Sequence, residues 1–217
     1  MIRLKFPIKE GGEPLRVLCL GAHSDDIEIG CGGTILRIRE QHSPCEFHWV
    51  VFSAIGIRGE EARKAAELFG QSSLQGPALK SFRDGYMPFE GASIKDFFEE
   101  LKQKVAPDLI FSHNHQDAHQ DHHLISELTR NTFRDHLILE YEIPKYDGDL
   151  GRPSFFVPLP VEMCRRKVQH IMDVFQTQHD KRWFQPETFF SMMRLRGVEC
   201  NAPSGYAEAF YCRKMTL

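Results

Sequence analysis

The sequence predicts an α/β domain of the Rossmann-like, three-layer kind with a mainly parallel sheet. Short, continuous apolar segments alternate along the chain with segments of helical spacing. Strands that are buried on both faces have this continuous apolar character, and their alternation with helices is typical of parallel sheets. The chain of 217 residues contains no internal repeat and no linker-like tract. Because domains commonly hold about 100–200 residues, we expect residues 1–217 to form a single domain.

Two strand–helix units are predicted near the N-terminus. An apolar run at 16–22 predicts the first strand, and a helical pattern follows over 32–40. The segment CEFHWVVFS at 45–53 predicts the second strand. Residues 60–69 predict a helix because they are rich in Ala, Glu and Lys, and Gly70 ends it.

The middle of the chain continues the alternation. A short strand is predicted within 77–82, and a helix is predicted over 94–105 with Ser93 as its N-cap. Pro107 ends this helix, because the residue before a proline is disfavoured in the helical region. Residues 108–112 then predict another strand that is buried on both faces.

The later elements complete the pattern after a polar loop. They are predicted as a helix at 122–133, a strand at 136–140, a short strand at 155–157, a helix at 161–176 and a closing strand within 205–213. In sheets of this kind, ligands bind just beyond the carboxyl ends of the strands. Polar residues that follow the strands are therefore the first candidates for a functional site.

Composition and charge exclude several function classes. The formal net charge is −3, with 41% hydrophobic and 26% charged residues. A slightly acidic chain with interspersed charges argues against nucleic acid or anionic lipid as a partner. The composition is that of a globular protein and not of a disordered chain or a fibre. It leaves the oligomeric state open, and a homo-oligomer is compatible with it.

The cysteines and the N-terminus favour the cytoplasm. The six cysteines form no CxxC pair, so we expect buried, reduced thiols, although a Cys200–Cys212 disulfide stays open. No segment approaches the roughly 20 apolar residues that a membrane-spanning helix needs. Residues 1–16 are charged and broken by Pro and Gly, so they lack the apolar core of a signal peptide.

Ionisable residues gather after two of the predicted strands. His23, Asp25 and Asp26 follow the first strand, and the segment DAHQDHH at 117–123 follows the strand at 108–112. Histidine and aspartate are ligands suited to Zn²⁺, Fe²⁺ or a similar divalent ion. Three ligands from two loops would leave coordination positions open, and a catalytic metal needs such positions for water and substrate.

A structural alternative exists for each of these groups. Asp25 and Asp26 could cap the following helix, and His113, His115 and His123 could be solvated loop residues. However, adjacent carboxylates repel each other unless a cation or a proton relieves the repulsion. Two acidic neighbours and two clustered histidines after separate strands therefore favour a metal site.

These segments resemble the PIG-L/LmbE-like N-acetylglucosaminyl deacetylase family. AHSDDIEIGCGGT at 22–34 is similar to that family's AHPDDxE signature, and HQDH at 119–122 is similar to its HPDH motif, with Asp117 at a frequent position before it. Ser24 and Gln120 stand where the family usually has proline. Supporting similarity is found in RGEEARKAAELFG at 58–70, FRDG at 82–85, residues 167–178 and GYAEAF at 205–210. The resemblance covers residues 16 to 212.

The resemblance implies a zinc site and a set of roles around it. The implied ligands of Zn²⁺ are His23, Asp26 and His122, and Fe²⁺ would suit the same donors. Asp25 would be the general base, His119 would polarise or protonate the tetrahedral intermediate, and Asp121 would orient His119. A carboxylate that is not bound to the metal can accept a proton from water, and a neighbouring histidine can stabilise an oxyanion.

The implied reaction is removal of an N-acetyl group from an N-acetyl-amino sugar or its small-molecule conjugate. Arg58 and Asp84 match family positions near the substrate and could hold sugar hydroxyls. The alternatives are a metal-dependent amidohydrolase on a non-sugar acyl amide, a non-haem Fe(II) oxygenase, and a nucleotide-binding module without catalysis. Asp25 favours hydrolysis, since an oxygenase needs no such base. GCGGT at 30–34 lacks the full GxGxxG spacing of a phosphate loop, so we expect it to allow a close turn into the helix.

Overall fold

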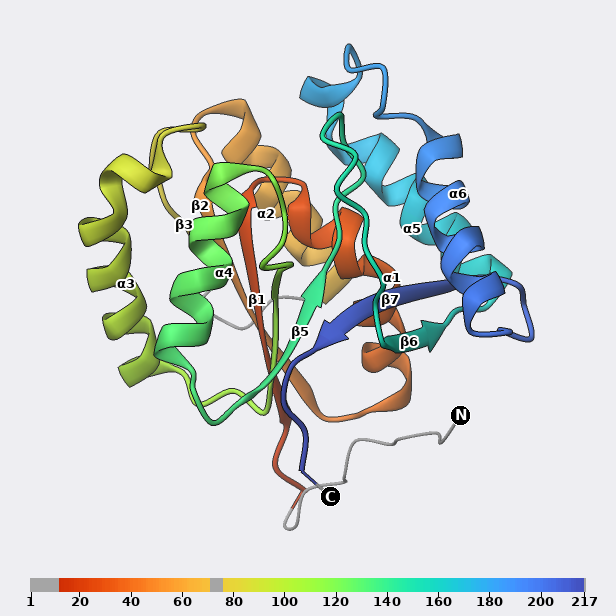
Figure 1. The fold of residues 1–217 in the computed structure, drawn as a ribbon, viewed down its shortest axis with the longest axis horizontal. Coiled ribbons are helices and arrows are strands. Elements are labelled where there is room, and N and C mark those ends of the chain that lie inside the picture. The colour runs from red at the N-terminus through yellow and green to blue at the C-terminus, as the bar shows by residue number, and fades with distance from the viewer. Residues whose placement is uncertain (1–11, 71–75, 217) are drawn as a thin grey trace.

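The computed structural model describes residues 12–70 and 76–216, and within them the predicted fold class is confirmed (Figure 1). Seven strands form one sheet in the order β3–β2–β1–β4–β5–β7–β6. Helices cover both faces of the sheet, which gives the expected three layers. Among the described helices, none is both long enough and apolar enough to cross a membrane. Most of the N-terminal segment used in the signal-peptide argument, residues 1–11, lies outside the described residues.

The elements follow one another in strand–helix alternation. The first are β1 (Leu15–His23), α1 (Asp26–Gln41), β2 (Cys45–Ser53), α2 (Ile57–Gly70), β3 (Ala78–Leu79), the 3₁₀ helix η2 (Met87–Glu90) and α3 (Gly91–Lys104). The later ones are β4 (Leu109–His113), α4 (Gln120–Thr132), β5 (Leu137–Tyr141), β6 (Phe155–Pro158), α5 (Val161–Val174), η3 (Gln176–Gln178), α6 (Pro186–Glu199) and β7 (Ala207–Cys212). The predicted bounds of the second strand are confirmed to the residue.

The order of the strands creates a switch point between β1 and β4. β1 pairs in parallel with both β2 and β4, and β5 continues the parallel part beyond β4. The chain therefore leaves β1 toward one side of the sheet and returns on the other side with β4. A crevice at the carboxyl ends of such strands is where open α/β sheets bind ligands. β7 runs antiparallel to both β5 and β6, so it points the opposite way from β1.

The core lies on both faces of the sheet because successive strand residues point to opposite sides. Val17 and Cys19 belong to the larger apolar cluster, which also holds residues of α1, α2, α5 and α6. Leu18 and Leu20 belong to a second cluster, which holds residues of α3 and α4. Burial on both faces explains why these strands read as continuous apolar runs.

The start of α1 differs from the prediction. The helix begins at Asp26, six residues before the predicted start, and its glycines lie inside it instead of forming a turn. A Cβ atom on Gly30 would overlap the ring of Tyr141, and one on Gly32 would come within 2.7 Å of Phe69. Glycine is therefore required for close packing of the helix, although it lowers helix propensity by about 1 kcal/mol relative to alanine.

Other helix bounds also differ. α3 starts at Gly91 as a continuation of η2, so Ser93 lies inside the helix and is not its N-cap. α6 was not predicted, because its buried face includes the charged Arg196, which interrupts the apolar periodicity. Cys200 and Cys212 are both free thiols, so the disulfide that the sequence left open is not formed.

Candidate active site

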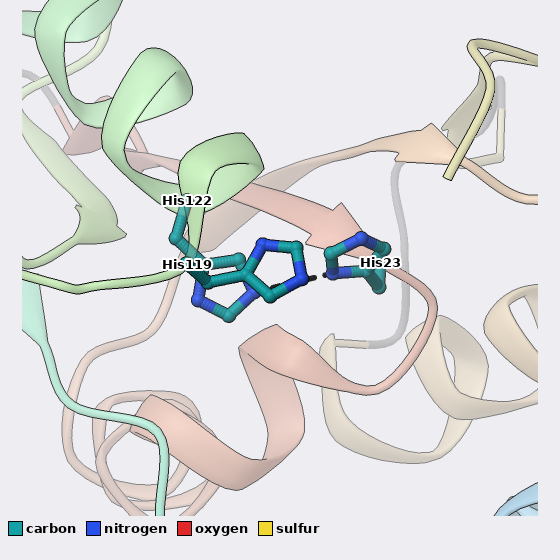
Figure 2. Close-up of side chains that lie close together, drawn as sticks. All are labelled: His23, His119 and His122. Carbon is teal, nitrogen blue, oxygen red and sulfur yellow. Dashed lines mark hydrogen bonds between the residues drawn. The ribbon is translucent and has the colours of Figure 1, made fainter. Parts of the chain in front are cut away.

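The two polar loops that the sequence singled out meet at the switch point. His23 is the last residue of β1, Asp25 is the N-cap of α1, and Asp26 begins that helix. On the other side, His119 is the N-cap of α4, and its Nδ1 accepts a hydrogen bond of 3.2 Å from the backbone N–H of Asp121. Figure 2 shows that the imidazoles of His23, His119 and His122 converge from these two segments.

The side chains of His23, Asp26 and His122, called the triad below, bring nitrogen and oxygen atoms close together. His23 Nδ1 lies 3.2 Å from His122 Nε2 and 3.4 Å from Asp26 Oδ2, and His122 Nε2 lies 3.5 Å from Asp26 Oδ1. Ligands of a tetrahedral zinc ion at 2.0–2.1 Å are separated by about 3.3–3.4 Å. The separations in the triad are close to this value, with a different oxygen of Asp26 facing each histidine.

The backbone and outer carboxylates hold this triad in place. Asp26 Oδ2 accepts a hydrogen bond of 2.6 Å from the backbone N–H of His23. Asp117 Oδ2 lies 3.0 Å from His122 Nδ1, and Asp121 Oδ2 lies 3.3 Å from His23 Nε2. Carboxylates that accept the second N–H of a ligating histidine fix its tautomer and its orientation. Each histidine of the triad thus has a carboxylate behind it.

The Asp121 carboxylate lies between the end of β1 and the segment that leads into η2. Its fully buried carboxylate accepts hydrogen bonds from the backbone N–H groups of Gly85 and Met87 and contacts His23. Its backbone N–H donates a hydrogen bond to His119 Nδ1. The expectation that the Asp121 side chain orients His119 stays a prediction, and the hydrogen-bond partners of this carboxylate favour His23 instead.

The two adjacent aspartates have different electrostatic surroundings. Burial and the neighbouring charge of Asp26 raise the pKa of Asp25, although Arg58, 3.7 Å away, acts in the opposite direction. Burial opposes ionisation of Asp26 too, but the surrounding histidines outweigh it and hold its pKa well below the usual range. Environments that separate two pKa values in this way are typical of an acid–base pair. Asp25 is thus the more basic of the two carboxylates.

The histidines of the triad are also distinct. Burial works against a charged His23, but Asp26, Asp121 and Asp84 outweigh it, so the pKa of His23 is well above its usual value. Burial and the charge of His113 lower the pKa of His122 to about 4. In the absence of a metal ion, the charged form is therefore favoured at His23 and the neutral form at His122.

Sequence reasoning missed His113, which one interpretation treated as a solvated loop residue. Its side chain is 0% exposed at the end of β4, and its Nε2 lies 3.2 Å from Asp26 Oδ2. The same nitrogen accepts a hydrogen bond of 3.0 Å from the backbone N–H of Ala22. The available signal was its place directly after the apolar run, where strand ends meet the site. His115 and His123 lie beside each other, outside the triad.

More than one set of donors converges here. Among the described residues, three groups bring ligand atoms within 4.8 Å of one another: His23 with His119 and His122, Asp26 with His113 and His122, and His23 with Asp84 and Asp121. The groups share His23 or His122, so they describe one centre with several neighbouring donors. His119 lies beside the triad, with its ring centroid 5.0 Å from that of His23.

Arg58 and Asp84 form an ion pair at the edge of this centre. Arg58 Nη1 donates to Asp84 Oδ2 at 2.8 Å, and Asp84 Oδ1 lies 3.0 Å from His23 Nε2. The Asp84 side chain is 52% exposed, unlike the buried Asp25 and Asp26. Both residues are thus accessible to a molecule that approaches the triad from solvent.

The chain is similar to proteins of known family and structure. The family model described as PIG-L, GlcNAc-PI de-N-acetylase, matches residues 18–133. The fold is similar to that of N,N′-diacetylchitobiose deacetylase from Pyrococcus horikoshii, with a TM-score of 0.73 and 20% identity over 96% of this chain and 87% of that one. It is also similar to the zinc-inhibited form of a teicoplanin deacetylase, with a TM-score of 0.70 and 12% identity over 91% and 97% of the two chains.

A further structure of this fold has a different activity in its description. The 4-carboxy-2-hydroxymuconate hydratase GalB from Pseudomonas putida KT2440 matches with a TM-score of 0.72 and 19% identity, over 93% of this chain and 97% of that one. Identities at this level establish the shared fold. The activity has to be argued from the site itself.

Proposed function

This chain belongs to the PIG-L family, and we propose that it is a metal-dependent hydrolase that removes the N-acetyl group from an acetamido sugar or its conjugate. The observation that carries the proposal is the triad of side chains, whose nitrogen and oxygen atoms approach one another within 3.2–3.5 Å, with a separate, more basic carboxylate beside it. Deacetylases among the structures of the same fold support it.

In this proposal His23, Asp26 and His122 hold the ion, for which Zn²⁺ is the first candidate and Fe²⁺ the second. When bound, a divalent ion polarises the amide carbonyl and lowers the pKa of a coordinated water. Asp25 accepts the proton of the attacking water, for which its raised pKa suits it. His119 donates a hydrogen bond to the oxygen of the former carbonyl as negative charge develops there.

The remaining steps also fall to residues of this chain. Cleavage of the C–N bond requires a proton for the departing amine, and Asp25 carries the proton taken from water. Asp117 and Asp121 keep the imidazoles of His122 and His23 in fixed orientations, so little reorganisation is needed during the reaction. Asp121 is therefore proposed as a positioning residue for His23.

The substrate assignment rests on family membership and on the edge of the site. Arg58 and Asp84 are placed where they could hydrogen-bond sugar hydroxyls, once the substrate competes with their mutual ion pair. The second candidate is hydrolysis of a non-sugar acyl amide. That reaction needs the triad and Asp25 but has no sugar hydroxyls for Arg58 and Asp84 to bind. As further proposals, we place the protein in the cytoplasm, without nucleic acid as a partner, and keep residues 1–217 as one domain.

The deciding experiment is an acetate-release assay on a panel of N-acetyl hexosamines and their nucleotide and lipid conjugates, with the zinc-loaded protein. Acetate release from an acetamido sugar that is abolished by a chelator and restored by Zn²⁺ is the expected result. Release from acyl amino acids or acetylated peptides alone would support the second candidate. Hydration of an unsaturated dicarboxylate without acetate release from any substrate would overturn hydrolysis, and the GalB-like fold makes this comparison necessary.

A further inference from the structure

The loop between β5 and β6 supplies a buried ammonium group behind the candidate site. Lys145 is only 9% exposed, and its Nζ lies 3.0 Å from Asp117 Oδ1 and 2.6 Å from Asp149 Oδ2. The third carboxylate nearby, Asp147, is 3.9 Å away and 43% exposed. No motif in the sequence pointed to Lys145, because its partner Asp117 lies far away along the chain.

The two carboxylates that Lys145 joins hold consecutive backbone amides. Asp149 Oδ2 accepts the N–H of Ala118 at 2.7 Å, and Asp117 Oδ1 accepts the N–H of His119 at 2.8 Å. The backbone N–H groups of Ala118 and His119 are thus each held by one of the two carboxylates. Asp117 also carries the contact to His122 Nδ1 through its other oxygen.

Lys145 therefore has two connections to the chemistry. One passes through Asp117 to His122, a proposed metal ligand, and the other passes through both carboxylates to the backbone that positions His119. An almost fully buried carboxylate such as Asp117 is costly to keep ionised without a cation beside it. The pKa of Asp117 is held well below its usual range, and His122, His113 and Lys145 together outweigh the effect of burial.

We propose that Lys145 is a positioning residue that holds Asp117 and Asp149 together, and thereby fixes the orientation of His122 and the location of His119. The proposal rests on the metal-dependent function above. Without the ammonium group, Asp117 would lose its shared position between His119 N–H and His122 Nδ1. Loss of such an outer partner typically reduces metal affinity or activity by about 10–100-fold.

The test compares Lys145→Met, Asp149→Asn and Asp147→Asn with the wild-type protein, with thermal unfolding as the check on folding. Zinc affinity is measured by competition with a fluorescent chelator, and kcat and KM are measured on the best substrate of the panel. Lys145→Met should bind zinc about 10–100-fold more weakly and have a lower kcat. Asp149→Asn should lower kcat while its zinc affinity stays within about threefold, because the Asp117–His122 contact remains. Asp147→Asn is the matched control and should match the wild type in both.

The outcomes separate this inference from the proposed function. If the wild type binds neither Zn²⁺ nor Fe²⁺, the proposed function fails. If the wild type binds zinc and a folded Lys145→Met binds it equally well with the same kcat, the role of Lys145 is overturned. Should Lys145→Met not fold, Asp149→Asn decides, while Lys145→Arg serves as the conservative variant that keeps a cation between the two carboxylates. An unchanged kcat in a folded Asp149→Asn would overturn the proposal that Lys145 and Asp149 fix the backbone at His119.

Discussion

Two regions of buried charge flank α1, and they are balanced in different ways. At the start of the helix, Asp25 and Asp26 are joined by Asp84, Asp117 and Asp121, whereas the ion pairs found there for the described residues involve only two permanent cations, Arg58 and Lys145. Farther along the helix, Lys167 and Glu208 form a one-to-one pair at 2.6 Å, and both are almost fully buried. An excess of carboxylates is costly unless a cation joins them, whereas a matched pair needs no ligand.

The matched pair has a structural role in α1. Glu208 accepts hydrogen bonds from the backbone N–H groups of Gly33 and Thr34, and Lys167 donates to the carbonyl oxygen of Ile29. In an α-helix Ile29 O and Gly33 N–H are partners, so both side chains bind backbone groups of the same turn of α1. The family-like segments that contain Lys167 and Glu208 thus support the helix that carries Asp25 and Asp26. The comparison indicates that carboxylates in excess of cations mark the candidate site, whereas the paired Lys167 and Glu208 stabilise the helix that carries it.

The largest effect is expected when a donor of the triad is removed. Asp26→Asn should lose bound zinc and, with it, measurable acetate release, because an open three-ligand site tolerates no missing ligand. Elemental analysis at limiting zinc measures the stoichiometry, and thermal unfolding shows whether the variant is folded. If Asp26→Asn binds zinc at the wild-type level, Asp26 is not a ligand, and the excess of carboxylates at this site does not mark a metal site.

The next effect separates the adjacent carboxylates. Asp25→Asn should keep its zinc but lower kcat by about 10²–10⁴-fold, since the amide cannot accept a proton from water. Steady-state kinetics and elemental analysis on one preparation check both parts. Near-normal turnover, or loss of zinc as in Asp26→Asn, would mean that the roles of the two aspartates are reversed.

On the support side, Lys167→Met should lower the free energy of unfolding by about 3–5 kcal/mol, because Glu208 is left as a buried charge without its cation. Its zinc content should be unchanged in the folded protein. Denaturant titration measures the change. Lys104→Met is the matched control, since the Lys104–Glu100 pair is exposed and should contribute less than about 1 kcal/mol. Equal effects of the two substitutions would contradict the structural role of the buried pair.

A smaller effect is expected at the edge of the triad. His119→Ala should lower kcat by about 10²–10³-fold with zinc retained, which is the typical contribution of one donor to a developing oxyanion. If the variant instead loses zinc, His119 belongs to the ligands, as its proximity to His23 and His122 allows. Kinetics together with chelator competition distinguish the two roles.

Sequence patterns predicted the strands better than the helices. β1, β2 and β4 are mostly apolar because both faces of the sheet are covered, so the sequence shows where they lie. The first turn of α1 and the whole of α6 depend on tertiary contacts: Gly30 packs on Tyr141, and Arg196 is buried against Glu142. Propensity and periodicity report neither contact, so these helices could not be placed from the sequence.

In the candidate site, too, some residues could be identified from the local sequence and others only from tertiary contacts. His23, Asp26 and His122 follow strand ends and belong to family-like motifs, and the structure brings them together. His113 and Lys145 were not identified, because one ends an apolar run and the other joins its partner only through the folding of a distant loop. The contact of the Asp121 carboxylate with His23 likewise depends on the angle at which α4 leaves its loop.

The reversed direction of β7 has a practical consequence. Because β7 runs antiparallel to β5, it starts beside the carboxyl end of β5, and its last residue, Cys212, pairs with Leu139 in the middle of that strand. The chain therefore leaves the sheet in the direction away from His23 and His113. In Figure 1 the chain that follows β7 accordingly runs away from the carboxyl end of β5. A fusion partner or surface anchor attached there would leave the entrance to the triad unobstructed. Immobilised protein for binding measurements is therefore best coupled through its C-terminal residues.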